Sequence, residues 1–433
     1  MGLSDGVGLV DVGWSLVSSR SVFEHRAVVL GGGVEEVVAG LGAVASGAVV
    51  SGAVASGSGV GSVVVGSVAS GVAAGGGRVV FVFPGQGWQW VGMGAALLDE
   101  SEVFAESMAE CGRALSEFVD WDLLEVVRGG AGGVSGVSDG LFGRVDVVQP
   151  VSWAVMVSLA RLWMSVGVVP DAVVGHSQGE VAAAVVAGVL SVTDGARVVA
   201  VRSRVIGEVL AGGGAMVSVG LPVAVVQDRL LGWGGRLGVA AVNGPSLTVV
   251  SGDVDAAVGF VGECERDGVW VRRVAVDYAS HSPRVEAVEG TLSRLLDGLC
   301  PGQGLVPFYS SVVGGVVDGT GLDGGYWYRN LRERVLFSDV VGRLVGDGFS
   351  GFVECSGHPV LAGGVLESVA VVDADVRPVV VGSLRRDDGG WGRFLTSVGE
   401  AFVGGMSVDW KCVFAGAGAR LVDLPTYPFQ RRH

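Results

Sequence analysis

Short apolar runs alternate with segments of helical spacing from residue 78 onward. Residues 79–83 predict a buried strand that ends at a Pro-Gly-Gln-Gly turn, and residues 93–111 then have the spacing of a helix. An apolar helix over residues 151–166, a short strand over 171–174 and an alanine-rich helix over 179–190 continue the alternation. Strands that alternate with helices indicate an α/β fold whose mostly parallel sheet is covered on both faces.

The pattern changes at the three glycines of residues 212–214. Short valine-rich strands follow, separated by turn signals such as Asn243-Gly244-Pro245. These predicted strands cover residues 215–219, 239–242, 248–251 and 270–276. We expect a small α+β subdomain here, inserted into a larger domain that resumes near His281 and continues through residues 352–354 and 379–381.

Residues 37–77 contain no charged residue and consist of Gly, Ala, Val and Ser plus Leu41. Their length would allow a membrane span. Gly and Ser interrupt the stretch every few residues, and no aromatic or basic anchor flanks it closely on both sides, so a flexible low-complexity linker is the preferred interpretation. A glycine-rich phosphate loop over residues 57–61 is a weaker alternative, because no strand and helix surround it.

Composition narrows the class of protein. The 433 residues allow about three folding units at roughly 150 residues each. A net charge of −15 and a pI near 4.8 argue against binding to nucleic acid or to an anionic membrane. Five widely spaced cysteines without a CxxC pair argue against a zinc site or a disulfide framework, and the first residues lack the pattern of a signal peptide. We therefore expect no bound metal and a reducing, cytoplasmic location.

The candidate chemistry is concentrated at Gly175-His176-Ser177-Gln178-Gly179, a G-x-S-x-G between a predicted strand and a predicted helix. Glycines allow the tight turn that lifts a serine hydroxyl out of the sheet, and the N-terminal N–H groups of the following helix point at the same place. Ser177 is therefore the candidate nucleophile. The alternative is a serine in an ordinary turn, since a chain with 76 glycines produces such a motif easily.

A serine hydroxyl is a weak nucleophile at neutral pH and needs a base. His176 adjoins the nucleophile and, because neighbours in such a turn face opposite ways, suits packing better than catalysis. His281 closes the inserted subdomain and could return over the edge of the sheet. His358 could equally be a turn histidine. From the residues alone His281 is the preferred base and His358 stays an alternative.

Four motifs occur in the order and spacing of the malonyl-CoA:acyl carrier protein transacylase family. They are Phe83-Pro84-Gly85-Gln86-Gly87, Gly175-His176-Ser177-Gln178-Gly179-Glu180, Arg202-Ser203 and Tyr278-Ala279-Ser280-His281. The chain resembles above all the acyltransferase domain of modular type I polyketide synthases. Residues 14–31 resemble the end of the linker between ketosynthase and acyltransferase, and residues 424–432 resemble the segment that follows the acyltransferase and packs back on that linker.

The resemblance covers essentially the whole chain and implies a fragment of a larger, multifunctional synthase. It implies a hydrolase-like large subdomain with a mostly parallel sheet and an inserted, ferredoxin-like α+β subdomain. The implied divisions are a partial ketosynthase-to-acyltransferase linker (1–77, with the low-complexity stretch 37–77), the large subdomain (78–211 and 281–382), the small subdomain (212–280) and the post-acyltransferase linker (383–433).

Residue roles follow from the matched motifs. Ser177 matches the acylated nucleophile of the family and His281 its general base. Gln86 and Gln178 match the two positions whose backbone N–H groups form the oxyanion hole. Arg202 matches the arginine that binds the free carboxylate of the extender unit, a task for which a planar guanidinium is suited. A solvated helix arginine beside Arg204 is its alternative interpretation.

Other residues carry weaker assignments. In the family the histidine is oriented by a backbone carbonyl, which by position would belong to Ser311. Gln149 and Asn243 match positions in the substrate pocket, although both could be simple hydrogen-bonding residues of turns. Arg329, Arg332 and Arg334 could form a basic patch for an acidic carrier protein.

The signature before the base favours one extender unit. Relatives that load methylmalonyl units carry Tyr-Ala-Ser-His, as at Tyr278 and Ser280, together with an Arg-Val-Asp-Val-Val-Gln-Pro segment, which here contains Gln149. Malonyl-loading relatives carry His-Ala-Phe-His instead. A small Ser280 leaves space for an α-methyl group that phenylalanine would crowd, although ethylmalonyl and larger units stay open.

The implied function is transfer of methylmalonyl from methylmalonyl-CoA, through an acyl-serine, to the phosphopantetheine thiol of an acyl carrier protein in the biosynthesis of a polyketide such as an antibiotic. No cofactor would be bound permanently, acyl-CoA would be a substrate, and the neighbouring ketosynthase and other domains of the same synthase would be partners. An α/β-hydrolase esterase or thioesterase is the competing enzyme class, and a docking scaffold with a vestigial site is the non-enzymatic one.

Overall fold

The computed structural model describes residues 7–46, 68–73, 77–129, 142–373 and 375–426. The chain forms two compact units. Unit 1 comprises residues 1–76, 163–169 and 398–433, and unit 2 comprises residues 77–162 and 170–397. The domain boundaries inferred from the sequence stay predictions.

The larger sheet of unit 2 has six strands in the order β10-β9-β4-β3-β11-β12. Five of these strands pair in parallel, and β10 runs antiparallel to β9. The central strands are buried along almost their whole length, which explains why they appear in the sequence as continuous apolar runs. The strands are β3 (Arg78–Phe83), β4 (Ala172–Gly175), β9 (Phe308–Ser310), β10 (Gly315–Val317), β11 (Phe349–Glu354) and β12 (Val379–Gly382). The expected α/β architecture is confirmed.

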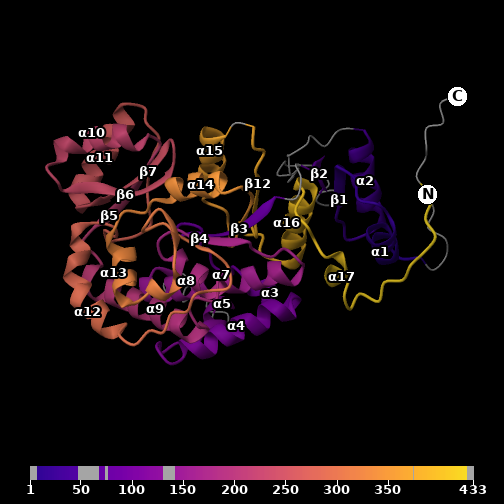
Figure 1. The fold of residues 1–433 in the computed structure, drawn as a ribbon, viewed down its shortest axis with the longest axis horizontal. Coiled ribbons are helices and arrows are strands. Elements are labelled where there is room, and N and C mark those ends of the chain that lie inside the picture. The colour runs from indigo at the N-terminus through magenta and orange to yellow at the C-terminus, as the bar shows by residue number, and fades with distance from the viewer. Residues whose placement is uncertain (1–6, 47–67, 74–76, 130–141, 374, 427–433) are drawn as a thin grey trace. The chain divides into compact units, whose positions relative to one another are not determined.

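Helices cover both faces of this sheet. In Figure 1, α7, α8 and α9 lie below β3 and β4, whereas α14 and α15 lie above them. The helices of unit 2 are α3 (Ala95–Glu100), α4 (Glu102–Leu115), α5 (Leu123–Val127), α7 (Val145–Ser165), α8 (Gly179–Val186), α9 (Val192–Val205), α12 (Glu289–Leu295), α13 (Gly324–Arg332), α14 (Phe337–Gly346) and α15 (Ala362–Val372). The last residues of α7 belong to unit 1, and α16 (Trp391–Gly404) is divided between the two units. A sheet covered in this way leaves its functional groups at the carboxyl ends of the strands.

Helix α7 begins at Val145, whereas the sequence predicted a helix over residues 151–166. Pro150 lies in the second turn, where proline removes a single backbone hydrogen bond, and the buried apolar side chains around it hold the helix. The longer helix brings Gln149 into the lining of a cavity that also contains Ser177 and His281. Among the described residues, α7 is the one helix long and apolar enough to cross a membrane, but 89% of its most apolar window is buried inside the protein, as in a core helix.

The inserted subdomain of unit 2 has four antiparallel strands in the order β6-β7-β5-β8, with α10 and α11 packed against them (Figure 1). Alternate residues of β5 are buried, and Val217 and Val219 form a small core with Val226 and Phe260. The elements are β5 (Ala215–Val219), α10 (Val223–Leu230), β6 (Leu237–Gly244), β7 (Leu247–Gly252), α11 (Val254–Arg266) and β8 (Val271–Arg273). The chain order βαββαβ is that of a ferredoxin-like fold, as expected.

Part of the low-complexity stretch in unit 1 is regular, contrary to the linker interpretation. Strand β2 (Val68–Val72) pairs antiparallel with β1 (His25–Val29), and α2 (Val34–Ala45) packs on β1 through Gly40, where a Cβ would come within 2.5 Å of Val29. Backbone pairing and close packing therefore order valine-rich residues whose composition alone suggests a flexible chain. Residues 47–67 and 74–76, which include the glycine-rich loop candidate at 57–61, lie outside the described residues.

The last described residues of unit 1 lie along α1 (Leu9–Ser19). The Arg420 N–H donates to Asp11 Oδ1 at 2.7 Å, and Arg20 Nη2 donates to the Leu424 carbonyl at 2.9 Å. These two hydrogen bonds hold residues 420–424 against α1. Unit 1 also contains α17 (Trp410–Val413).

Candidate active site

Ser177 lies in the sharp turn between β4 and α8. Its backbone has a φ of 54°, the left-handed region that side chains rarely adopt. The turn also requires small neighbours, because a Cβ at Gly179 would come within 2.0 Å of the Phe83 carbonyl oxygen, and one at Gly175 within 2.3 Å of the Glu180 backbone. The G-x-S-x-G sequence is therefore needed for close backbone approach, and Ser177 projects from the carboxyl end of the sheet.

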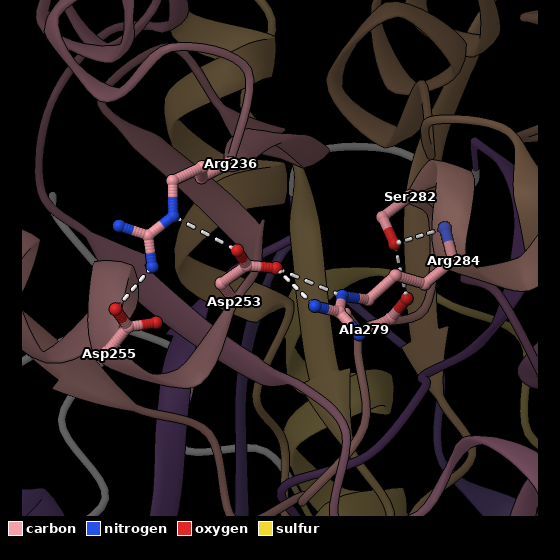
Figure 2. A network of polar contacts seen from close by, with 6 residues as sticks. All are labelled: Arg236, Asp253, Asp255, Ala279, Ser282 and Arg284. Atoms are coloured by element: carbon pink, nitrogen blue, oxygen red, sulfur yellow. Dashed lines mark hydrogen bonds and ion pairs between the residues drawn. The ribbon is translucent and has the colours of Figure 1, made fainter.

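His281 lies in a second strained turn, with a φ of 59°. Figure 2 shows how this turn is held: Ser282 Oγ donates to the Ala279 carbonyl at 2.7 Å and accepts from the Arg284 N–H at 3.3 Å. The Arg284 guanidinium donates to Asp253 Oδ1 at 2.5 Å, and Asp253 directly precedes α11. The turn that carries the histidine is thereby connected to the small subdomain.

The two strained turns bring Ser177 and His281 together. The distance from Ser177 Oγ to His281 Nε2 is 2.9 Å, although 104 residues separate them along the chain. His281 Nδ1 lies 2.7 Å from the Glu333 carbonyl oxygen, so Nδ1 carries the proton and Nε2 is free to accept one from the serine. Burial, and then the charge of Arg202, lower the pKa of His281 to about 3, which keeps the imidazole neutral at physiological pH.

The orienting carbonyl corrects one expectation from the sequence. Ser311 was expected to supply it, but the carbonyl belongs to Glu333, just beyond the end of α13. Ser311 instead donates its N–H and its hydroxyl to Glu180 Oε1, at 2.5 and 2.7 Å. The sequence carries no signal for Glu333, because any residue can supply a backbone carbonyl.

The two other histidines considered as candidate bases make different contacts. His358 Nδ1 accepts from the Arg386 N–H at 3.2 Å, so the alternative base is engaged in a turn. His176 Nε2 lies 2.8 Å from Asn243 Oδ1, which connects the nucleophile turn to β6 of the small subdomain. Among the described residues, His281 is the histidine that contacts Ser177 Oγ.

Arg202 comes from the last turn of α9 and is 2% exposed. Its Nη2 lies 3.4 Å from Ser177 Oγ, and its Nη1 donates to Gln149 Oε1 at 3.2 Å. None of the ion pairs within the described ranges involves Arg202, and its Nε has no hydrogen-bond partner there. Burial lowers its pKa to about 10, so it remains a cation at neutral pH. A buried cation that forms no ion pair within the described ranges favours an anionic ligand.

Tyr278 connects this cation to the Pro-Gly-Gln-Gly turn. Its hydroxyl donates to Gln86 Oε1 at 2.5 Å and accepts from Gln149 Nε2 at 3.2 Å, and Gln149 in turn accepts from Arg202. Burial raises the pKa of Tyr278 to about 12, which keeps the phenol protonated. Gln149 and Tyr278 are thus brought together with the other pocket residues predicted from the sequence.

The peptide between Gly85 and Gln86 is held from its carbonyl side. The Gly85 carbonyl accepts from Trp88 Nε1 at 2.8 Å and from Gln178 Nε2 at 3.2 Å, and both donors are buried. A planar trans peptide directs its N–H opposite to its carbonyl, so the Gln86 N–H points away from Trp88. Trp88 was not among the residues predicted from the sequence, because an aromatic residue after a glycine turn looks like core packing.

These groups share one cavity of about 360 Å³. The large subdomain contributes Gln86, Ser177, Arg202 and His281 to its lining, and the small subdomain contributes residues of β5 to β8 and the exposed Trp270. The cavity therefore combines a serine nucleophile, a neutral histidine base and a buried cation.

Two arginines of the basic patch expected from the sequence already have acidic partners. Arg329 pairs with Glu333 at 2.8 Å, and Arg332 pairs with Glu286 at 2.7 Å.

Comparison with known proteins identifies the family of the chain. Residues 80–408 match the family model described as acyl transferase domain. The chain belongs to that family. The structure resembles the acyltransferase domain from module 8 of the salinomycin polyketide synthase, with a TM-score of 0.85 and 47% identity, over 94% of this chain and 91% of that one. It also resembles the malonyl-CoA:acyl carrier protein transacylase of Xanthomonas oryzae, with a TM-score of 0.63 and 28% identity, over 72% of this chain and 96% of that one.

Two curated relatives are much longer than this acyltransferase chain. It is 52% identical over 422 residues to the spectinabilin polyketide synthase system protein NorA' of Streptomyces orinoci, covering 98% of this chain and 11% of that protein. It is 48% identical over 419 residues to the pikromycin polyketide synthase component PikAII of Streptomyces venezuelae, covering 96% of this chain and 10% of that protein. The expected family, that of acyltransferase domains of modular polyketide synthases, is confirmed.

Proposed function

We propose that this acyltransferase loads a methylmalonyl unit from methylmalonyl-CoA onto the phosphopantetheine thiol of an acyl carrier protein, through an acyl ester of Ser177. The observation that carries the proposal is the pairing of a hydrogen-bonded Ser177–His281 couple with the buried guanidinium of Arg202 in one cavity. Arg202 would bind the free carboxylate of the acyl group, and Ser177 would attack its thioester.

In the first half-reaction, His281 Nε2 takes the proton of Ser177 Oγ as that oxygen bonds to the thioester carbon. The carbon–sulfur bond then breaks, the imidazolium returns its proton to the sulfur, and free CoA leaves. In the second half-reaction, the sulfur of the phosphopantetheine thiol attacks the carbonyl carbon of the acyl-Ser177 ester, and His281 Nε2 takes the proton of that thiol. The Ser177 oxygen leaves and recovers that proton, so the enzyme ends as it began.

The developing oxyanion needs donors that are already in place. The backbone N–H of Gln178, at the start of α8, and that of Gln86 are the two that we propose. The hold of Trp88 and Gln178 on the Gly85 carbonyl supports this role, because it fixes the plane of the peptide that bears the Gln86 N–H. Each such donor contributes about 3 to 4 kcal/mol to stabilisation of the transition state in other acyl-transfer enzymes.

The partners proposed from the sequence follow from this mechanism. An acyl carrier protein would present its thiol at the mouth of the cavity, and the ketosynthase and other domains of one synthase would be neighbours of this chain. We further propose a role in the biosynthesis of an antibiotic or another polyketide in the cytoplasm. No resident cofactor takes part in the proposed steps, since acyl-CoA is consumed as a substrate.

One incubation tests the proposal against its alternatives. The enzyme is mixed with methylmalonyl-CoA labelled in the acyl group, with and without a phosphopantetheinylated carrier protein, and intact masses are recorded over time. We expect an acyl-enzyme whose label moves to the carrier protein. Release of free methylmalonic acid as the main product would instead indicate a hydrolase. Absence of label from both proteins would indicate a scaffold.

Selectivity for the α-methyl group can be tested at Tyr278 and Ser280. Both residues are buried and line the cavity, and Ser280 is the smaller wall. Changing them together to His and Phe should shift the ratio of kcat/KM for methylmalonyl-CoA over malonyl-CoA by roughly 10- to 200-fold towards malonyl-CoA, the scale set by one methyl group. Steady-state kinetics with both substrates gives this ratio.

The matched control is Tyr278→Phe, which removes the hydrogen bonds to Gln86 and Gln149 but keeps the ring. It should lower the rate with both substrates and leave their ratio nearly unchanged. An unchanged ratio in the double variant would mean that other walls of the cavity select the extender unit.

A further inference from the structure

Glu180 is a fully buried acid one helical turn from the nucleophile, and the mechanism above does not use it. Four donors surround its carboxylate. Oε1 accepts from the N–H and the hydroxyl of Ser311, at 2.5 and 2.7 Å. Oε2 accepts from the Tyr326 hydroxyl at 2.6 Å and from Asn330 Nδ2 at 2.9 Å. Burial raises the pKa of this carboxyl, and the hydrogen bonds from Tyr326, Ser311 and Asn330 act in the opposite direction. In each of the four contacts a carboxyl oxygen is the acceptor.

Asn330 joins this carboxylate to the nucleophile. Its Nδ2 donates one hydrogen to Glu180 Oε2 and the other to the backbone carbonyl of Ser177, at 3.0 Å. Its Oδ1 is buried and has no hydrogen-bond partner among the described residues. An amide that uses both of its hydrogens and neither lone pair is held in place for its donors.

The helix that carries Asn330 also holds the base. Just after Asn330, the carbonyl of Leu331 accepts from the His281 N–H at 2.9 Å, and the carbonyl of Glu333 contacts His281 Nδ1 at 2.7 Å. The C-terminal end of α13 thus fixes both the backbone and the ring of His281. The position of His281 relative to Ser177 therefore depends on the hydrogen bonds that Asn330 donates to the Ser177 carbonyl and to Glu180 of α8.

We propose that Glu180 is a positioning residue for catalysis, which acts by holding Asn330 between the Ser177 carbonyl and the end of α13 and so sets the distance from Ser177 Oγ to His281 Nε2. This proposal rests on the proposed function for the reaction that it assists, and on the hydrogen bonds above for the geometry.

A purely structural role would give a different result. A buried hydrogen-bonded acid that only stabilises the fold affects the temperature of unfolding and leaves the folded enzyme active. A positioning residue affects the chemical step in folded enzyme, because an error of about 1 Å between reacting groups costs on the order of 10²-fold in rate. The two roles therefore separate when kcat, KM and thermal stability are measured on the same variants.

The informative variants are Glu180→Gln, Asn330→Asp and Asn330→Ala. In Glu180→Gln the amide NH2 group replaces either Oε1 or Oε2, and in both orientations it faces two groups that donate to Glu180 in the wild-type enzyme. In Asn330→Asp a carboxylate oxygen replaces Nδ2 and faces the Ser177 carbonyl, which cannot donate to it, and the Glu180 carboxyl, which cannot donate to it as an ionised group. Asn330→Ala removes the link without adding a charge, and serves if the aspartate variant does not fold. The matched control is Ser311→Ala, which removes one donor to Glu180 and contacts neither Asn330 nor Ser177.

The experiment uses the full chain in two assays: transfer from methylmalonyl-CoA, and the reaction of Ser177 with diisopropyl fluorophosphate, which needs the activated serine but no acyl-CoA. We expect each of the three variants to lose about 10- to 100-fold in kcat and in the rate with the probe, with KM changed by less than about threefold. Ser311→Ala should lower the unfolding temperature but keep kcat within about threefold.

Near wild-type rates in the folded Glu180 and Asn330 variants would overturn the inference, and so would an equal loss of rate in Ser311→Ala. If wild-type enzyme reacts with the probe but not with acyl-CoA, the proposed function fails while the probe rates still decide the role of Glu180. Wild-type enzyme that does not react with the probe would overturn the inference as well, because Ser177 would then not be activated.

Discussion

Replacement of Ser177 by alanine is expected to abolish acylation of the enzyme. The hydroxyl that bonds His281 Nε2 at 2.9 Å is the proposed attacking group, so its removal should lower kcat for transfer by about 10⁴-fold or more. Intact-mass spectrometry after incubation with labelled methylmalonyl-CoA should find no acyl adduct on the variant. The fold should be retained, because alanine is smaller than serine and the neighbouring glycines are unchanged.

Ser338→Ala is the control for this experiment. Ser338 is a partly buried serine of α14 whose hydroxyl bonds Ser368 at 3.0 Å, and it does not line the cavity. This variant should be acylated like wild-type enzyme. An adduct that persists in Ser177→Ala would locate the nucleophile elsewhere and remove the basis of the mechanism.

Replacement of Arg202 by alanine is expected to change which acyl-CoA is used. Loss of a buried cation that binds a carboxylate should reduce kcat/KM for methylmalonyl-CoA and malonyl-CoA by about 10²-fold or more. Acetyl-CoA has no free carboxylate, so its kcat/KM should change by less than about fivefold. Steady-state kinetics with the three substrates measures the effect, and the pKa of His281 should rise because the neighbouring charge is gone.

Arg204→Ala is the matched control, since Arg204 lies on the same helix but is exposed and outside the cavity. It should leave the order of preference among the three substrates unchanged. An equal loss with acetyl-CoA and the carboxylated substrates in Arg202→Ala would mean that the arginine supports the Ser177–His281 pair and does not bind the carboxylate.

Much of the fold and of the candidate site could be predicted from the sequence. The apolar runs indicated the central strands, the change in pattern after residue 212 indicated the inserted subdomain, and the matched motifs indicated Ser177, His281, Arg202, Gln149 and Tyr278. These predictions were possible because hydrophobic periodicity and side-chain chemistry can be read directly from the sequence. The structure brings these five side chains into one cavity.

The parts that could not be predicted depend on backbone groups and on packing. The carbonyl of Glu333 orients His281, and no side-chain pattern marks a carbonyl. The helix predicted over residues 151–166 begins at Val145 instead, because buried neighbours hold α7 on both sides of Pro150. The order in α2 and β2 likewise depends on contacts with β1 that composition does not encode. The sequence analysis named Glu180 as the last residue of the nucleophile motif and assigned it no role, because its hydrogen bonds involve residues more than 100 positions away.

The left-handed backbone conformations of Ser177 and His281 lower the stability of the fold at the two residues on which activity depends. Holding a residue other than glycine in that region costs about 1 to 2 kcal/mol at each position, and glycine or asparagine would relieve most of that cost. The substitutions that would relax these two turns are therefore ones that delete the nucleophile or the base. Engineering a hardier version of this domain should leave both positions untouched and seek its gains elsewhere.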